Sequence, residues 1–214
     1  MFSCAYELDL DIEEVRKELQ YLNDPKFKDR GYDDLCFYVS DKTVEEEGCE
    51  NIIKFKELFN NGFVEGIRFL NMKPKQTYNP HVDSNEQGFH PDIPMDMHQP
   101  GNVNILLSKP VGDETVWYID GELRRLQPWA FSNNGDLYPD CDSNSMGVSQ
   151  DGLIKVDRWS ITDRPTLFNT SVWHTIRSND TDHIRRSACF VFWPYNSFQG
   201  IVEAVRHKGL LIER

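Results

Sequence analysis

Long apolar runs and paired cysteines are both missing from this 214-residue sequence. The longest uninterrupted apolar stretch is Ala188–Trp193, whereas a membrane-spanning helix needs roughly 20 such residues. The opening residues, MFSCAYELDLDIEE, carry carboxylates where a signal peptide has a basic and then an apolar segment. The five cysteines form no CxxC pair and are odd in number, which favours reduced thiols. We therefore expect a soluble cytoplasmic protein with no membrane partner.

Basic residues are also scarce, with 23 Lys and Arg against 35 Asp and Glu and a formal net charge of −12. A field of this sign repels nucleic acid, so we do not expect a nucleic-acid partner. Hydrophobic residues make up 39% of the chain and aromatic residues 12%, which is enough for a real core. The length suits a single domain over 1–214. No pattern in the chain indicates an oligomeric state.

The first 62 residues read as a helical part. Residues 11–22 are predicted to form an amphipathic helix with Asp11 at its N-cap and carboxylates in its first turn. A second helix is predicted over 50–61, and the acidic stretch Asp41–Glu50 is interpreted as a solvated connector. A last helix is predicted over 196–207, with Gly209 past its end.

From Gly66 onward, short apolar runs alternate with Pro, Gly and Asn. Strands are predicted near 66–72, 102–107, 114–119, 165–169, 172–178 and 185–193. Short strands without intervening helices favour a mainly β fold, a sandwich or jelly roll. The polar segment 120–164 is interpreted as an insertion or lid, or as an overlooked strand pair.

The most informative short motif is Pro80-His81-Val82-Asp83. Side chains at i and i+2 of an extended chain share a face, so His81 and Asp83 offer two of the three ligands of a facial iron site. Chance alone predicts about 0.6 His-x-Asp matches at this composition, and His90-Pro91-Asp92 also matches. We favour His81 and Asp83, because the prolines around His90 and Asp92 oppose strand pairing.

A second candidate region lies in the last quarter of the chain. His174 stands near the start of one predicted strand, and Arg185, Arg186 and Ser187 open the next. A guanidinium at the mouth of an apolar strand needs an acidic partner or an anionic ligand. Arg185 and Ser187 share one face and suit a carboxylate ligand. The alternative is an arginine paired with an aspartate at the rim.

Taken in order, these residues resemble the motif of the 2-oxoglutarate- and Fe(II)-dependent oxygenases. That family uses His-x-Asp, a distant histidine and then Arg-x-Ser, as in His81, Asp83, His174, Arg185 and Ser187. Flanking stretches are similar to the prolyl- and aspartyl-hydroxylase-like branch, which includes small phage and bacterial members. The resemblance covers roughly residues 63–195. The interval from His174 to Arg185 is slightly long, which leaves Arg186 as a rival, and 120–164 has no counterpart.

The resemblance implies a double-stranded β-helix (a cupin-like jelly roll) with flanking N- and C-terminal helices. It also implies that His81, Asp83 and His174 hold the metal and are catalytic, and that Arg185 and Ser187 bind 2-oxoglutarate. The implied cofactors are Fe(II), 2-oxoglutarate and O2, with ascorbate as an optional stimulant. The implied enzyme is a dioxygenase that hydroxylates a small molecule or a peptide and converts 2-oxoglutarate to succinate and CO2. Its implied location is the cytoplasm, or a host cytoplasm if the chain is phage-encoded.

The residues alone agree with this ligand logic, since three protein ligands leave metal positions open for chemistry. An apolar wall of Leu106, Val116, Phe168 and Val191 is expected around the site. Tyr78 and Trp117 either line the pocket or belong to the core. Two other functions stay open: an inactive jelly-roll binding module, and a metal cupin that needs no co-substrate.

Overall fold

The structure, a computed structural model, describes residues 3–31, 35–60, 62–74, 100–120, 153–177, 182–192, 195 and 197–212. These residues form two antiparallel β-sheets with accompanying helices. The larger sheet has the order β1 (Ala5–Glu7), β8 (Thr166–Asn169), β5 (Gly101–Leu106), β10 (Arg185–Val191), β4 (Ile67–Met72), β3 (Cys36–Val39) and β2 (Arg30–Gly31). The smaller sheet has the order β7 (Leu153–Ser160), β6 (Glu114–Asp120) and β9 (Trp173–Arg177). The helices are α1 (Glu13–Leu22), the 3-10 helix η1 (Pro25–Phe27), α2 (Asp41–Glu46), α3 (Glu50–Leu58) and α4 (Phe198–His207).

The six predicted strands and three predicted helices are all present, with ends that differ by up to three residues. Helix α1 starts after Ile12, and the Asp11 carboxylate still accepts a hydrogen bond from the Glu13 N–H at 3.2 Å. Gly209 follows α4 with a φ of +70°, as a helix C-terminus requires.

Two predictions need correction. The first 62 residues are not a purely helical part, because β1, β2 and β3 lie among them and belong to the larger sheet. Residues 41–46 form helix α2 and not a connector, because the Ser40 hydroxyl accepts the Thr43 N–H at 3.2 Å and so caps the helix. For the segment 120–164, the strand alternative is confirmed over residues 153–160, which form β7 and pair with β6 in the smaller sheet. Residues 121–152 lie outside the described residues.

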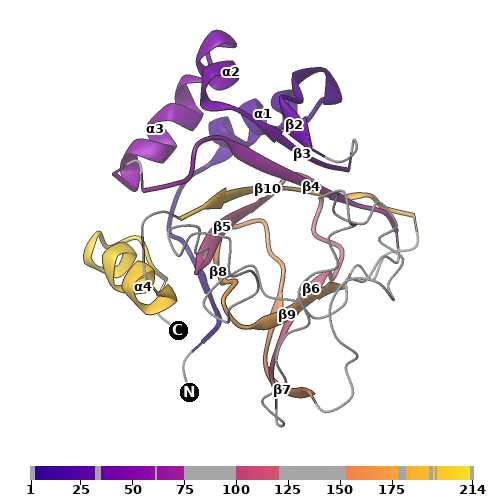
Figure 1. The fold of residues 1–214 in the computed structure, drawn as a ribbon, viewed down its shortest axis with the longest axis vertical. Coiled ribbons are helices and arrows are strands. Elements are labelled where there is room, and N and C mark those ends of the chain that lie inside the picture. The colour runs from indigo at the N-terminus through magenta and orange to yellow at the C-terminus, as the bar shows by residue number, and fades with distance from the viewer. Residues whose placement is uncertain are drawn as a thin grey trace, which may run out of the picture.

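The larger sheet separates apolar and polar side chains onto its two faces. In β10, Ala188 and Phe190 join the main core cluster, which also contains buried residues of α1, α3 and α4. Arg185, Ser187 and Cys189 alternate with them and so point to the opposite side. Helices α1–α3 lie on the first side of this sheet and the smaller sheet lies on the second (Figure 1). The side that is directed at the smaller sheet is called the inner face below.

A second apolar cluster joins the two sheets on the inner face. Leu106 and Phe168 of the larger sheet contact Trp117 and Trp159 of the smaller sheet, and all four are nearly buried. The ring centroids of Trp117 and Phe168 lie 5.6 Å apart. The Trp117 indole also donates a hydrogen bond to the backbone oxygen of Asn169 at 2.8 Å. Leu106 and Phe168 of the expected apolar wall thus lie on the inner face, whereas Val116 lies on the opposite face of β6, because it alternates with Thr115 and Trp117.

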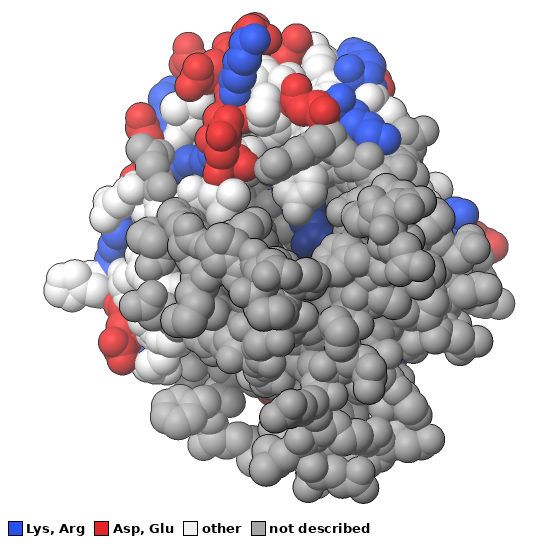
Figure 2. All heavy atoms as spheres, in the orientation of Figure 1, with Lys and Arg blue, Asp and Glu red and all other residues white. Residues whose placement is uncertain are grey.

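Charged side chains of both signs are interspersed over the helical end of the molecule (Figure 2). Several form exposed pairs within one helix, including Lys17–Glu14, Lys42–Glu46 and Lys54–Glu50. Exposed pairs of this kind contribute little to stability. None of the helices in the described ranges is both long and apolar enough to span a membrane.

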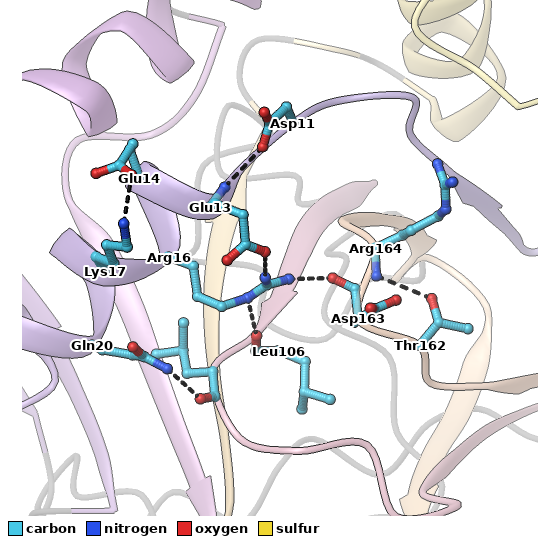
Figure 3. A network of polar contacts seen from close by, with 11 residues as sticks. Asp11, Glu13, Glu14, Arg16, Lys17, Gln20, Leu106, Thr162, Asp163 and Arg164 are labelled. Carbon is cyan, nitrogen blue, oxygen red and sulfur yellow. Dashed lines mark hydrogen bonds and ion pairs between the residues drawn. The ribbon is translucent and has the colours of Figure 1, made fainter.

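Helix α1 is attached to the end of β5 through two polar side chains (Figure 3). The Arg16 Nε donates to the Leu106 carbonyl at 3.2 Å, and Gln20 donates to the Leu107 carbonyl at 2.8 Å. The same guanidinium contacts the Glu13 carboxylate and the Asp163 carbonyl. One arginine therefore connects α1, the end of β5 and the segment that follows β7.

Candidate functional site

The predicted site residues divide into those that the structure describes and those that it does not. His174, Arg185 and Ser187 are described and buried. The predicted ligands His81 and Asp83 lie outside the described residues, as do the rival pair His90 and Asp92 and the pocket candidate Tyr78. Among the residues with described positions, no three His, Cys, Asp or Glu side chains gather as a metal site. The three-ligand set therefore remains a prediction.

His174 lies in the smaller sheet on the same face as Trp117. The two residues are cross-strand partners in β9 and β6, and Trp117 belongs to the cluster between the sheets, so His174 shares the inner side. Its ring Nδ1 lies 2.9 Å from the Val172 carbonyl oxygen. Because a carbonyl only accepts, Nδ1 carries the proton in this contact. A ring Nδ1–H donated to a backbone carbonyl is a contact that commonly orients a metal-ligating histidine.

Arg185 is a buried cation on the inner face of β10, with a relative exposure of 1%. Its Nε lies 3.9 Å from the Asp113 Oδ2, and its Nη1 lies 3.1 Å from the Met72 sulfur. Its neighbour Arg186 is exposed on the opposite face, where its backbone N–H donates to the Ser108 hydroxyl at 3.1 Å. Strand alternation thus places Arg185, and not Arg186, on the inner face.

Ser187 lies two residues further along β10 on the same face, and its cross-strand partners are Leu70 in β4 and Leu106 in β5. Its hydroxyl donates a hydrogen bond to the backbone oxygen of Leu70 at 3.1 Å. A hydroxyl has a single proton, so in this geometry Ser187 offers lone pairs and no donor to a ligand.

Asp113 and Thr115 lie close to this region and were not among the predicted site residues. Asp113 is 1% exposed, immediately precedes β6, and forms the buried ion pair with Arg185. Thr115 is 2% exposed, and its hydroxyl has no hydrogen-bond partner among the described residues. The signal available was the alternation Asp113-x-Thr115-x-Trp117 at the start of a predicted strand, which places the three side chains on one face. Their burial depends on pairing with strands that are distant in the sequence, so the local sequence pattern does not predict it.

A hydrogen-bonded chain of small polar side chains follows the inner face beyond Ser187. The Cys189 thiol lies 2.9 Å from Asn104 Oδ1, and the Asn104 amide donates to Asn102 Oδ1 at 2.8 Å. Asn104 is partly exposed even though β5 is hydrogen-bonded on both sides. Arg68 of β4, the cross-strand partner of Cys189, is also partly exposed. Solvent therefore reaches the middle of the inner face.

On the other face of the smaller sheet, Tyr118 lies beside two charged residues, Arg177 and Glu114. Burial raises the pKa of the Tyr118 phenol, against the opposing effect of the Arg177 guanidinium. Arg177 donates to the phenol oxygen at 3.0 Å and lies 3.9 Å from the Glu114 carboxylate. These side chains alternate with Thr115 and Trp117, so they stabilise the sheet from outside the candidate site.

Comparison with known proteins gives a likeness of fold. No protein-family model matches the chain, and no curated protein matches its sequence. The structure is similar to the epimerase SnoN in complex with Fe3+, alpha ketoglutarate and nogalamycin RO, with a TM-score of 0.51, 16% identity, and coverage of 88% of this chain and 77% of that chain. A second structure of SnoN, the non-heme alpha ketoglutarate dependent epimerase from nogalamycin biosynthesis, gives a TM-score of 0.50, 13% identity, and coverage of 88% and 76%. At this identity the likeness shows a shared fold alone.

Proposed function

We propose that this chain is a 2-oxoglutarate- and Fe(II)-dependent dioxygenase that hydroxylates a small molecule or a peptide. In this proposal the strands from β4 to β10 form a double-stranded β-helix within one domain over 1–214. His81, Asp83 and His174 hold Fe(II), and Arg185 binds the distal carboxylate of 2-oxoglutarate, with Ser187 next to it on the same face of β10.

One observation carries the proposal: a buried arginine and a buried histidine occupy the inner sides of the two sheets. Arg185 lies in β10, and His174 lies in β9 with its ring Nδ1 2.9 Å from the Val172 carbonyl oxygen. The order of these residues along the chain and the fold shared with an alpha ketoglutarate dependent enzyme, SnoN, give independent support.

The described residues fit the two implied groups. The imidazole of His174 is a type of ligand that Fe(II) accepts. The buried guanidinium of Arg185 suits a carboxylate, and the buried hydroxyl of Thr115 lacks a hydrogen-bond partner within the described ranges. When bound, Fe(II) and 2-oxoglutarate supply the activation of O2, with 2-oxoglutarate converted to succinate and CO2.

The chain's own residues then perform three tasks. Arg185 orients an anionic co-substrate by its fixed positive charge, because it is always protonated. The Val172 carbonyl holds the ring of His174 in one orientation. Trp117, Phe168 and Leu106 exclude water from one end of the inner face. O2 is the oxidant, and ascorbate is an optional reductant in assays.

The polar inner face favours a substrate with hydrogen-bonding groups. The partly exposed Asn104 and Arg68 offer an amide and a guanidinium there. The net charge of −12 opposes a nucleic-acid substrate. We place the reaction in the cytoplasm, without a membrane partner.

The test is an anaerobic titration with Fe(II) and 2-oxoglutarate that follows the visible charge-transfer band of the chelate. We expect the wild type to show the band, His174→Ala to lose it, and Arg185→Ala to need about 100-fold more 2-oxoglutarate. The exposed residues His207 and Arg186 provide matched controls, and His207→Ala and Arg186→Ala should titrate like the wild type.

The Asp113 contact also fits a second function, a metal-free binding module in which Arg185 only completes an internal ion pair. In that case no band forms at saturating Fe(II), and the oxygenase proposal fails. A metal cupin without co-substrate gives a different result, since it binds metal through His174 while Arg185→Ala changes nothing.

A further inference from the structure

The hydroxyl of Thr115 is buried at a position where the described strands offer it no hydrogen bond. Thr115 is 2% exposed, and no residue in the described parts of the chain forms a hydrogen bond with its Oγ1. Its cross-strand partners are Trp159 in β7 and Ile176 in β9. A buried hydroxyl without a partner is costly, so such groups in folded proteins usually meet a ligand or an ordered water.

The position of Thr115 relates this hydroxyl to the buried cation. Asp113 and Thr115 are two residues apart. The backbone hydrogen bonds between the two chain segments of β6 and β7 extend to Asp113, whose backbone oxygen accepts the Ile161 N–H at 2.9 Å. Their side chains therefore share the inner side of the smaller sheet. Asp113 approaches Arg185 at 3.9 Å, so Thr115 lies one strand step from the residue that contacts the guanidinium.

The serine that the sequence motif assigns to carboxylate binding, Ser187, already donates its hydroxyl proton within the protein. The Ser187 hydroxyl donates its only proton to the Leu70 carbonyl. A carboxylate accepts hydrogen bonds and cannot donate them, so a ligand held by Arg185 needs another hydroxyl donor. Thr115 is a buried hydroxyl with its proton available among the described contacts.

We propose that Thr115 donates the hydroxyl hydrogen bond to the distal carboxylate of 2-oxoglutarate beside Arg185. The inference rests on the proposed function and deepens it, because it makes Thr115 a determinant of specificity for dicarboxylic 2-oxo acids. Asp113, whose carboxylate lies 3.9 Å from the Arg185 Nε, positions the guanidinium.

The test compares Thr115→Val with the wild type under anaerobic conditions with Fe(II). Valine has nearly the shape of threonine and removes only the hydroxyl, so the Kd of 2-oxoglutarate should rise about tenfold. Thr115→Ser should keep the affinity within about threefold of the wild type. Ser187→Ala should weaken 2-oxoglutarate less than Thr115→Val does.

Two further readouts separate ligand binding from a structural role. The first uses 2-oxovalerate, in which a methyl group replaces the distal carboxylate, and Thr115→Val should not weaken its binding. The second is the Tm of the metal-free protein, which should stay equal or rise in Thr115→Val because an unsatisfied buried hydroxyl is removed. The control Thr166→Val, whose hydroxyl donates to the Arg164 carbonyl at 3.1 Å, should lower the Tm and leave the Kd unchanged.

Each outcome decides the matter. An unchanged Kd for 2-oxoglutarate in Thr115→Val, or an equal loss for 2-oxovalerate, overturns the inference while the proposed function stands. A lowered Tm with an unchanged Kd assigns Thr115 a structural role. Absence of saturable 2-oxoglutarate binding in the wild type overturns the proposed function and this inference together.

Discussion

Two buried thiols, Cys4 and Cys49, show how strongly single side chains respond to burial. Burial raises the pKa of Cys4 to about 12, and the nearby carboxylate of Asp157 adds to the effect. Burial likewise raises the pKa of Cys49 to about 11, with smaller contributions from Glu18 and Glu47. Both thiols stay protonated in the folded chain at neutral pH, so neither is a nucleophile there.

These thiols predict a loss of stability at alkaline pH. Their pKa values are higher in the folded chain than the ordinary value of 9.0. The unfolded chain therefore releases their protons first, and each thiol lowers the free energy of unfolding by up to about 1.4 kcal/mol per pH unit above pH 9. The decline should continue to about pH 11 for Cys49 and pH 12 for Cys4.

Urea unfolding at pH 8 and pH 10 measures this slope. The double variant Cys4→Ala and Cys49→Ala should lose less stability than the wild type between these two pH values. Equal losses in the two proteins would show that other groups control the alkaline limit.

Among the elements, β4 begins at a crowded glycine. Gly66 has a φ of +86°, and a Cβ at this position would lie 2.7 Å from the Val39 backbone oxygen. Its N–H donates to the Asp41 carboxylate at 3.0 Å, and that carboxylate also binds the buried Lys56 ammonium at 2.5 Å. The start of the strand is thus fixed by β3, α2 and α3 together.

Gly66→Ala should therefore destabilise the chain more than a left-handed conformation alone requires. We expect a loss of about 2–4 kcal/mol, since strain and a backbone clash act together. Gly48→Ala is the matched control, because Gly48 has a φ of +66° and no atom within 4 Å of the added Cβ. It should cost about 1 kcal/mol. Equal losses in urea unfolding would contradict the clash.

Predictability from sequence also differs from element to element. The long strands and the helices α1, α3 and α4 carry their own apolar pattern, so β10 and α4 were recognisable by themselves. Strand β1 has three residues and β7 carries several charged residues, and both exist through their pairing with β8 and β6. Helix α2 has six residues and depends on the Ser40 cap and on Lys56 from another helix.

The same distinction applies to the candidate site. The positions of His174, Arg185 and Ser187 at the starts of two strands followed from local pattern, and the alternation of β10 separates Arg185 from Arg186. The roles of Asp113 and Thr115 come from burial between two sheets, which no local pattern contains. His81 and Asp83 stay predictions.

At the scale of the whole molecule, Arg16 connects parts of the chain that are far apart in sequence. Its side chain is 16% exposed and reaches the Leu106 and Asp163 carbonyls from α1. Arg16→Ala leaves these partly buried carbonyls without a donor and should lower the free energy of unfolding by about 1–3 kcal/mol. Hydrogen exchange should also become faster in α1.

Arg164→Ala is the control for that prediction. Arg164 is 50% exposed and lies 3.6 Å from the exposed Asp9 carboxylate, so its removal should change stability by less than about 1 kcal/mol. If both variants unfold at the same urea concentration, the contacts of Arg16 do not hold α1 in place.

The separation of apolar and polar side chains onto the two faces of the larger sheet affects how mutations can alter ligand preference. Side chains on the helix-facing side of the larger sheet, such as Phe190, belong to the main core cluster. Side chains on the inner face, such as Asn102, Asn104 and Cys189, lie outside that cluster. A library that randomises only these inward positions should yield many folded members with altered ligand preference. The period of two along each strand thus lets selection for a new substrate proceed almost independently of selection for folding.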